Sequence, residues 1–215
     1  MSEAAPGLPD PATFSTEARS RLAEATRRLI DAIITLSEIP DEEIDAAAAR
    51  IREVTRQLGG DVRPTGAGYR PGGSLDWLPR SPFVGEASPV SPPAKWELRG
   101  ERVHARVTFG AIYEGPPGYV HGGFIAMAFD ELLGLTNAHL GRPGMTGTLS
   151  VKYRRPTPLH REVRLESWIE QIEGRRVVAR VELRDGETLC AEAEGLFVAL
   201  RPEVAEAYFA NRDPS

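Results

Sequence analysis

Residues 121–140 hold the groups of this chain that are best suited to chemistry. The stretch reads HGGFIAMAFDELLGLTNAHL and begins with His121, Gly122 and Gly123, at the start of a predicted helix. The first amide groups of a helix have no acceptor within it and lie at the positive end of its dipole, so they can hold an oxygen that becomes negative. Glycines let a ligand approach this backbone closely. The turn is therefore a candidate oxyanion site; the alternative is an ordinary glycine-rich helix start that His121 caps.

Two acidic residues, Asp130 and Glu131, lie in the middle of the same stretch, which is otherwise apolar almost all the way round. That pattern predicts a buried helix. An unpartnered buried carboxylate destabilises a fold, so we expect Asp130 to have a functional role. The alternative is a structural carboxylate that accepts a hydrogen bond from a strand hydroxyl. Glu131 lies about 100° round the helix, and we rank it below Asp130.

The spacing of Gly122 and Asp130 predicts that a single helix cannot bring both to the same substrate atom. Nine helical residues span about 13 Å. Two antiparallel helices related by a two-fold axis would solve this, with Asp130 of one subunit facing Gly122 of the other. We therefore expect an obligate dimer with composite sites.

The composition excludes several classes of protein. Among 215 residues, 41% are hydrophobic and 27% charged, as in ordinary globular proteins, and the net charge of -5 argues against a nucleic-acid partner. One cysteine, Cys190, and four scattered histidines without a CxxC or HExxH motif predict neither a disulfide nor a metal site. The start of the chain lacks the basic and apolar regions of a signal peptide, and the longest apolar run, 124–129, is far short of the roughly 20 residues of a membrane span. We expect a cytoplasmic protein.

Helical spacing over residues 16–59 predicts two helices joined as a hairpin. Pro40 ends the first, Asp41 caps the second, and Gly59 with Gly60 ends it. The apolar residues of both helices form one face, which needs something to lie against.

From about residue 95 apolar and polar residues alternate, which predicts strands. The strongest alternation lies at 101–109 and, after the long helix, at 149–153, 163–172, 177–183 and 188–200. Turns at Glu173-Gly174 and Asp185-Gly186 predict consecutive antiparallel hairpins. One helix against a curled antiparallel sheet of five to six strands is the economical α+β arrangement. The predicted division is a disordered tail at 1–15, the helical hairpin at 16–59, a proline- and glycine-rich wrapping segment at 60–94, the main domain at 95–202 and a C-terminal tail at 203–215.

An ordered set of short blocks resembles the hotdog-fold thioesterases, most closely the PaaI-like group and, within it, the mitochondrial long-chain acyl-CoA thioesterases. The resemblance covers roughly residues 81–202. The matching blocks are Gly115-Pro116-Pro117-Gly118, His121-Gly122-Gly123, Asp130, Thr146, Tyr153-Arg154-Arg155-Pro156, Glu173-Gly174-Arg175 and Ala191-Glu192-Ala193 through Leu196-Phe197.

The resemblance implies a central helix wrapped by a sheet, a homodimer or tetramer with one continuous sheet per dimer, and active sites at the subunit interface. It implies hydrolysis of an acyl-CoA or acyl-carrier-protein thioester, with no cofactor beyond the coenzyme A of the substrate. Asp130 matches the catalytic carboxylate, the Gly122 amide the oxyanion donor, and Thr146 a residue that orients the carboxylate or the water; Thr148 is the neighbour most easily confused with Thr146. Many relatives carry Asn or Gln at the position of Gly115, so the water-holding role has no assigned residue.

Lys152, Arg154 and Arg155 form a basic cluster before Pro156 that would suit the phosphates of coenzyme A, or else a solvated strand face. Gly123 would join them in substrate binding. Three other functions stay open: a non-catalytic acyl-CoA-binding module, a hotdog hydratase or dehydratase, which would need a paired Asp and His, and a structural dimer whose function resides in the N-terminal helices.

Overall fold

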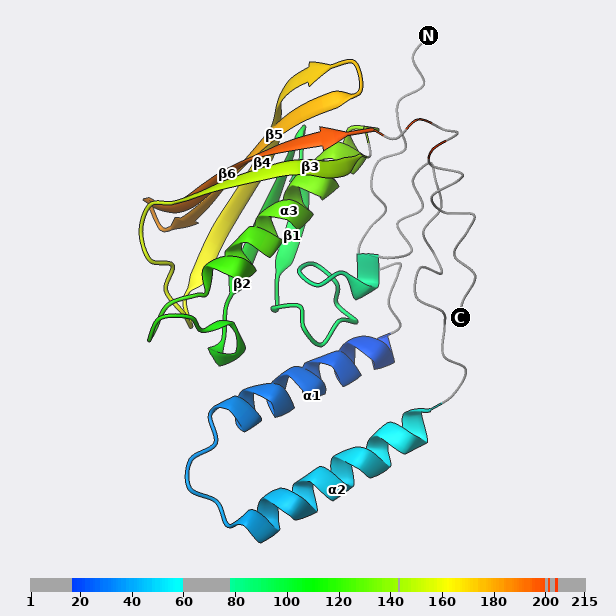
Figure 1. The fold of residues 1–215 in the computed structure, drawn as a ribbon, viewed down its shortest axis with the longest axis vertical. Helices are drawn as coiled ribbons and strands as arrows, with labels where there is room; N and C mark the ends of the chain where they lie inside the picture. The colour runs from blue at the N-terminus through cyan, green and yellow to red at the C-terminus, as the bar shows by residue number, and fades with distance from the viewer. Residues whose placement is uncertain (1–16, 60–77, 143, 200, 202–203, 205–215) are drawn as a thin grey trace.

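The computed structural model describes residues 17–59, 78–142, 144–199, 201 and 204 (Figure 1). Three predicted parts lie wholly or partly outside the described residues: the tail at 1–15, the first part of the wrapping segment, at 60–77, and nearly all of the tail at 203–215.

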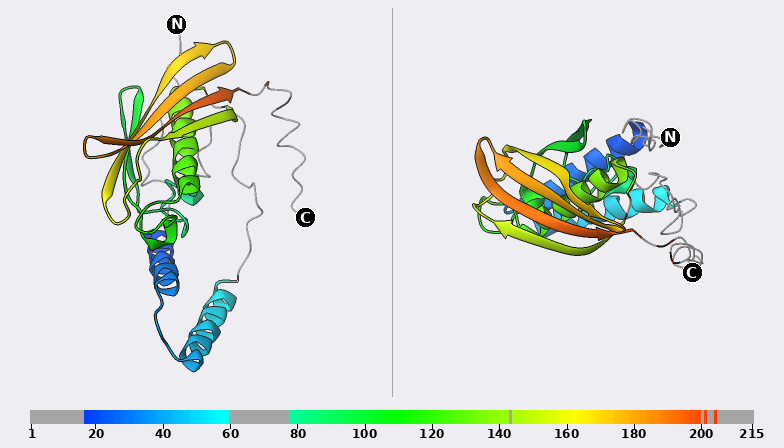
Figure 2. Two further views of the ribbon diagram at one scale, coloured as in Figure 1. Left: turned by 60° about the vertical axis from the view of Figure 1, so that its left-hand side comes forward. Right: turned by 90° about the horizontal axis from the view of Figure 1, so that it is seen from above.

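A six-stranded antiparallel sheet curls round one long helix, as the alternating pattern predicted (Figure 1, Figure 2). The strand order is β1-β2-β4-β5-β6-β3. The helix is α3 (Gly122–His139), and the strands are β1 (Lys95–Arg99), β2 (Arg102–Thr108), β3 (Met145–Tyr153), β4 (Glu162–Glu173), β5 (Arg176–Asp185) and β6 (Thr188–Val198). This confirms the α+β hotdog architecture expected from the sequence.

The two predicted hairpin turns join β4 to β5 and β5 to β6. Gly174 and Gly186 have φ values of 57° and 58°, a conformation that glycine adopts without strain. The strand β3 follows α3 in the sequence but pairs with β6, the last strand, and therefore lies at an edge of the sheet. Its outward edge has no partner among the described strands.

The helix α3 is covered on one side only. Phe129, Leu132 and Leu133 are fully buried in the core that the helix shares with the sheet. On its other side Gly123 and Asp130 are exposed. The prediction of a helix buried all round, with a buried Asp130, is wrong for a single chain, because the curled sheet covers only the opposite face of the helix.

The N-terminal helices α1 (Glu17–Ile34) and α2 (Asp41–Leu58) lie beyond the sheet, with α1 the nearer (Figure 1). The helix α1 packs against the short helix η3 (Ala111–Tyr113), and Arg27 Nη1 donates a hydrogen bond to the carbonyl of Ser88 at 2.9 Å. Asp41 is the first residue of α2 and not its cap, which is Pro40 without a side-chain hydrogen bond.

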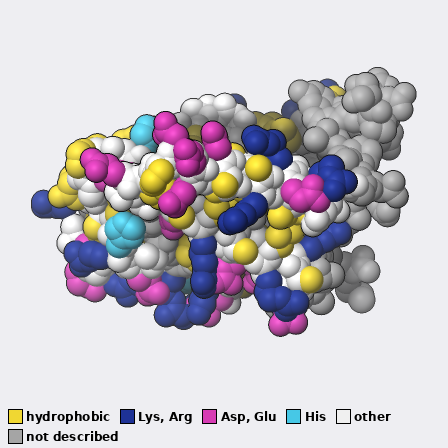
Figure 3. All heavy atoms as spheres, turned by 90° about the horizontal axis from the view of Figure 1, so that it is seen from below, with side chains coloured by type: hydrophobic (Ala, Val, Ile, Leu, Met, Phe, Trp, Pro, Cys, Tyr) yellow, Lys and Arg dark blue, Asp and Glu magenta, His cyan; other side chains and the backbone are white. Residues whose placement is uncertain are grey.

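The apolar faces of α1 and α2 stay exposed in the single chain. Eight large side chains are between 37% and 59% exposed, namely Leu22, Leu29, Ile33, Ile34, Ile44, Ile51, Val54 and Leu58. Seen from below, apolar side chains lie among arginines and carboxylates on the surface (Figure 3). No helix in the described part of the chain combines the length and apolar character needed to cross a membrane.

Candidate active site

The turn into α3 is built on His121. This residue is the N-cap, with φ -64° and ψ 133°, and its Nδ1 accepts a hydrogen bond from the Gly123 amide at 3.0 Å. The preceding loop packs directly on it, because a Cβ added to Gly115 would lie 2.7 Å from the His121 Cα. Any side chain at position 115 would therefore displace the turn, which gives a structural reason why this chain lacks the Asn or Gln of many relatives.

Gly122 follows as the first residue of the helix. Its carbonyl oxygen accepts a hydrogen bond from the Tyr153 hydroxyl at 2.8 Å. Within the described part of the chain its amide donates to no acceptor. Of the two glycine amides, that of Gly123 is thus used by the cap, and that of Gly122 is available to a ligand.

Asp130 lies two turns farther along α3. Thr146 Oγ1 donates a hydrogen bond to its Oδ1 at 2.7 Å, and the carboxylate is exposed. This bond orients the side chain and leaves its second oxygen free of any described partner. No group of three or more His, Cys, Asp or Glu side chains in the described residues is arranged to hold a metal ion.

A β-bulge decides why Thr146 and not Thr148 reaches Asp130. In the pairing of β3 with β6, Leu149 lies opposite Gly195 and Thr146 opposite Phe197, with a shift of register between Thr146 and Thr148. Gly195 and Phe197 belong to the buried, helix-facing side of β6. Strict alternation from Leu149 would turn Thr146 to the outer face, so the extra residue of the bulge returns it to the face of α3.

Glu131 points away from this site. Ser81 Oγ donates a hydrogen bond to its Oε1 at 2.5 Å. Burial raises the pKa of Glu131 to about 7; the bond from Ser81 lowers it, and the neighbouring Asp130 raises it. Glu131 thus packs against the segment before β1, whereas Asp130 is exposed beside Thr146.

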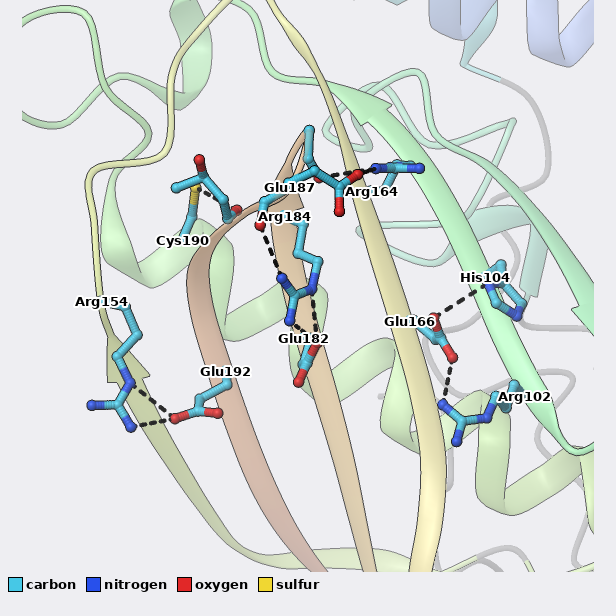
Figure 4. A network of polar contacts seen from close by, with 12 residues as sticks. Arg102, His104, Arg154, Arg164, Glu166, Glu182, Arg184, Glu187, Cys190 and Glu192 are labelled. Atoms are coloured by element: carbon cyan, nitrogen blue, oxygen red, sulfur yellow. Dashed lines mark hydrogen bonds and ion pairs between the residues drawn. The ribbon is translucent and has the colours of Figure 1, made fainter.

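The basic cluster is partly neutralised. Arg154 Nε donates to Glu192 Oε1 at 2.9 Å, and this bond lowers the pKa of Glu192 (Figure 4). Lys152 lies opposite the same Glu192 on the outer face of the sheet. Arg155 is exposed and makes no side-chain bond to another described residue. A phosphate would therefore compete with Glu192 for Lys152 and Arg154, whereas Arg155 is free.

The outer face of the sheet carries further ion pairs, which lie away from α3. Glu166 contacts both Arg102 and His104, and Arg184 pairs with Glu182 (Figure 4). Such exposed pairs contribute little to stability. Cys190 is buried nearby, as expected of a packing residue.

The predicted site residues thus form two groups within one chain. Thr146 joins Asp130, whereas Gly122, beside the bonded pair of His121 and Gly123, contacts Tyr153, which was not predicted as a site residue. Two signals pointed to Tyr153: its alternation with Leu149 and Val151, and its place in the block Tyr153-Arg154-Arg155-Pro156 of the family resemblance. Gly122 and Asp130 are about 12 Å apart along the helix axis, so the two groups do not meet within the chain.

Known proteins share part of this sequence. Residues 117–192 match the family model described as Thioesterase superfamily. This part of the chain is therefore similar to members of the thioesterase superfamily. The chain is 41% identical over 95 residues to the acyl-coenzyme A thioesterase THEM4 of Xenopus laevis, covering 43% of each protein. It is 29% identical over 96 residues to the acyl-coenzyme A thioesterase THEM5 of Homo sapiens, covering 44% of this chain and 39% of that one. The chain thus spans less than half the length of these curated relatives.

A solved structure extends the likeness beyond the sheet. The crystal structure of the thioesterase superfamily protein RHA08564 matches with a TM-score of 0.74 and 29% identity, over 86% of this chain and 92% of that one. A match of that extent reaches into the N-terminal helices. The N-terminal helices therefore have a counterpart in at least one solved structure of a thioesterase superfamily protein.

Proposed function

We propose that this protein is a thioesterase that hydrolyses acyl-CoA, or acyl-carrier, thioesters to a free acid and a thiol. The superfamily match and the acyl-CoA thioesterases among its relatives support the class of reaction. We further propose that it works as a cytoplasmic homodimer whose only cofactor-like group is the coenzyme A of the substrate.

One observation carries the proposal: the two halves of the site are tied to opposite ends of the edge strand β3. Asp130 is bonded to Thr146, near the start of β3, and Gly122 is bonded to Tyr153, its last residue. A long edge strand whose outer edge has no partner among the described strands is a ready template for pairing with a second copy. Antiparallel pairing places the start of one strand beside the end of the other. Asp130 of one subunit would then lie beside Gly122 of its partner, and the site would be composite.

In this arrangement the thioester carbonyl oxygen accepts a hydrogen bond from the Gly122 amide. Asp130, oriented by Thr146, takes a proton from a water whose oxygen attacks the carbonyl carbon. The tetrahedral oxyanion then collapses, the C–S bond breaks, and the thiolate takes up the proton. In the other route the carboxylate attacks directly, the thiolate leaves, and water cleaves the resulting anhydride. Single turnover in heavy-oxygen water tests for the second route, because label enters Asp130 only when water attacks the anhydride at the Asp130 carboxyl carbon.

A panel of acyl-CoAs of different chain length, with aromatic members included, tests the proposed reaction by the release of free thiol. We expect turnover with at least one class of acyl group. Binding without thiol release would instead support an acyl-CoA-binding module, and water addition to an unsaturated acyl chain without thiol release would support a hydratase.

Coenzyme A binding is proposed for the end of β3. Arg155 is the member of the basic cluster that no described side chain neutralises, and we propose that it contacts a substrate phosphate. Replacing Arg155 with Gln should raise KM for acyl-CoA several-fold and leave kcat nearly unchanged. The same KM for both proteins would remove Arg155 from the binding site.

A further inference from the structure

Gly122 is held from two sides. On one side His121 Nδ1 accepts the amide of the next residue, Gly123, at 3.0 Å. On the other side the Tyr153 hydroxyl donates to the carbonyl oxygen of Gly122 itself, at 2.8 Å. Among the described residues these bonds leave the Gly122 amide oriented and without an acceptor.

The tyrosine ring also explains why position 122 has no side chain. A Cβ added to Gly122 would lie 3.1 Å from Cζ and from the hydroxyl oxygen of Tyr153. Glycine at position 122 and tyrosine at position 153 therefore fit each other, and a larger residue at either place pushes the other away. The fit is specific to Gly122, because a Cβ on Gly123 would meet His121 instead.

This contact is not a consequence of burial. Tyr153 is 54% exposed, so its hydroxyl could be satisfied by water without any protein partner. Two successive glycines are the most flexible way to begin a helix, whereas an oxyanion donor stabilises a transition state only when it is held in place beforehand. A hydroxyl on the carbonyl and a ring against the Cα supply that restraint.

We infer that Tyr153 is a positioning residue that fixes the Gly122 amide for the developing oxyanion, an inference that rests on the proposed thioesterase function. Because Tyr153 is the last residue of β3, it also connects the helix start to the edge strand. Pairing of two subunits along β3 would thus restrain the donor at the same time as it brings in the partner's carboxylate.

Replacing Tyr153 with Phe tests this role, since it keeps the ring and removes the hydroxyl. We expect kcat to fall about 10- to 100-fold and KM for acyl-CoA to change less than about twofold, because the oxyanion exists only after binding. A trifluoromethyl ketone analogue of the substrate, which forms an oxyanion mimic, should lose affinity in parallel with kcat. A thioether analogue should bind as before. Tyr119→Phe, at an exposed tyrosine whose hydroxyl bonds no described residue, is the matched control and should behave as wild type.

A second variant guards against a purely structural effect. Gly122→Ala keeps the amide but displaces the ring, so it should also lower kcat, and the double variant should lose less than the product of the two single losses, because both act through one contact. Two results would overturn the role of Tyr153 but leave the proposed function standing. One is a wild-type kcat in Tyr153→Phe, and the other is an equal loss of affinity for the oxyanion mimic and for the thioether. Absence of thiol release by the wild-type protein would instead overturn the proposed function.

Discussion

The helices α3 and α2 both expose side chains in a single chain, but these side chains differ in kind: α3 leaves one side uncovered, whereas no residue of α2 is buried. On α3 the uncovered side presents Asp130, oriented by Thr146, and a free Gly122 amide beside Tyr153. On α2 the exposed residues include Ile44, Ile51 and Leu58, and no contact within the described part of the chain orients them. The apolar residues of α2 could be covered by any apolar surface. The polar groups of α3 are already oriented without a ligand, which indicates a site that a substrate and a second subunit complete.

The largest expected effect follows from removing the charge at Asp130. Asp130→Asn keeps an oxygen for the Thr146 hydroxyl, so the side chain should stay in place, but it can neither accept the proton nor attack. We expect kcat to fall about 10²- to 10⁴-fold with little change in KM. Steady-state thiol release measures this, and near-wild-type kcat would end the assignment of Asp130.

The substitution Gly122→Pro removes the free amide N–H at the start of α3. Proline is well suited to the first position of a helix, and the conformation of His121, with ψ 133°, suits a residue before proline. The helix should therefore form without its free N–H, and kcat should fall about 10²- to 10³-fold. Gly122→Ala crowds Tyr153 but keeps the N–H, so a loss for proline no larger than that for alanine would show that the amide is not the donor.

Glu131 provides a test at the covered side of α3. Its pKa is raised from 4.5 to about 7 in the folded chain, mainly by burial, so the folded state holds the extra proton between these values. Stability should therefore fall as the pH rises from about 4.5 to about 7. Glu131→Gln keeps an acceptor for Ser81 and has no proton to lose. We expect it to match the wild type near pH 4.5 and to exceed it at pH 8 by on the order of 2 kcal/mol. If the difference in the free energy of unfolding between the two proteins stays the same from pH 4.5 to 8, this prediction is contradicted.

The smallest effect is expected on α2. Ile51→Gln changes an exposed side chain far from α3, so kcat/KM should change less than about twofold and the free energy of unfolding by about 0.5 kcal/mol or less. Thermal unfolding and the thiol assay measure both. A loss of stability of several kcal/mol would mean that α2 is covered in the assembled protein. The exposed residues of α2 and of α3 would then both belong to interfaces.

The parts of the structure that the sequence predicted are those set by local pattern. Alternation gave the strands, and Gly174 and Gly186 marked the hairpins, because a period of two and a left-handed turn are visible within a few residues. The pairing of Asp130 with a strand hydroxyl was also foreseen as one reading of that residue. The edge position of β3 was not, because it depends on which distant strand, β6, closes the sheet.

The remaining features of the site depend on contacts between segments far apart in the chain. Exposure of Asp130 follows from how far the sheet curls round α3, which no helical pattern encodes. The choice of Thr146 over Thr148 depends on a bulge, and the absence of a side chain at Gly115 depends on its packing against His121. The bond from Ser81 to Glu131 joins residues 50 positions apart and left no signal in the sequence.

Mixing two inactive variants tests the composite site most directly. Asp130→Asn and Gly122→Pro chains are purified separately, shown to be inactive, and then unfolded and refolded together in equal amounts. If each site takes Asp130 from one subunit and Gly122 from the other, half of the dimers regain one intact site, and thiol release should recover to about a quarter of the wild-type rate. If mixed dimers form and the activity stays at the level of the separate variants, Asp130 and Gly122 do not act across a subunit interface.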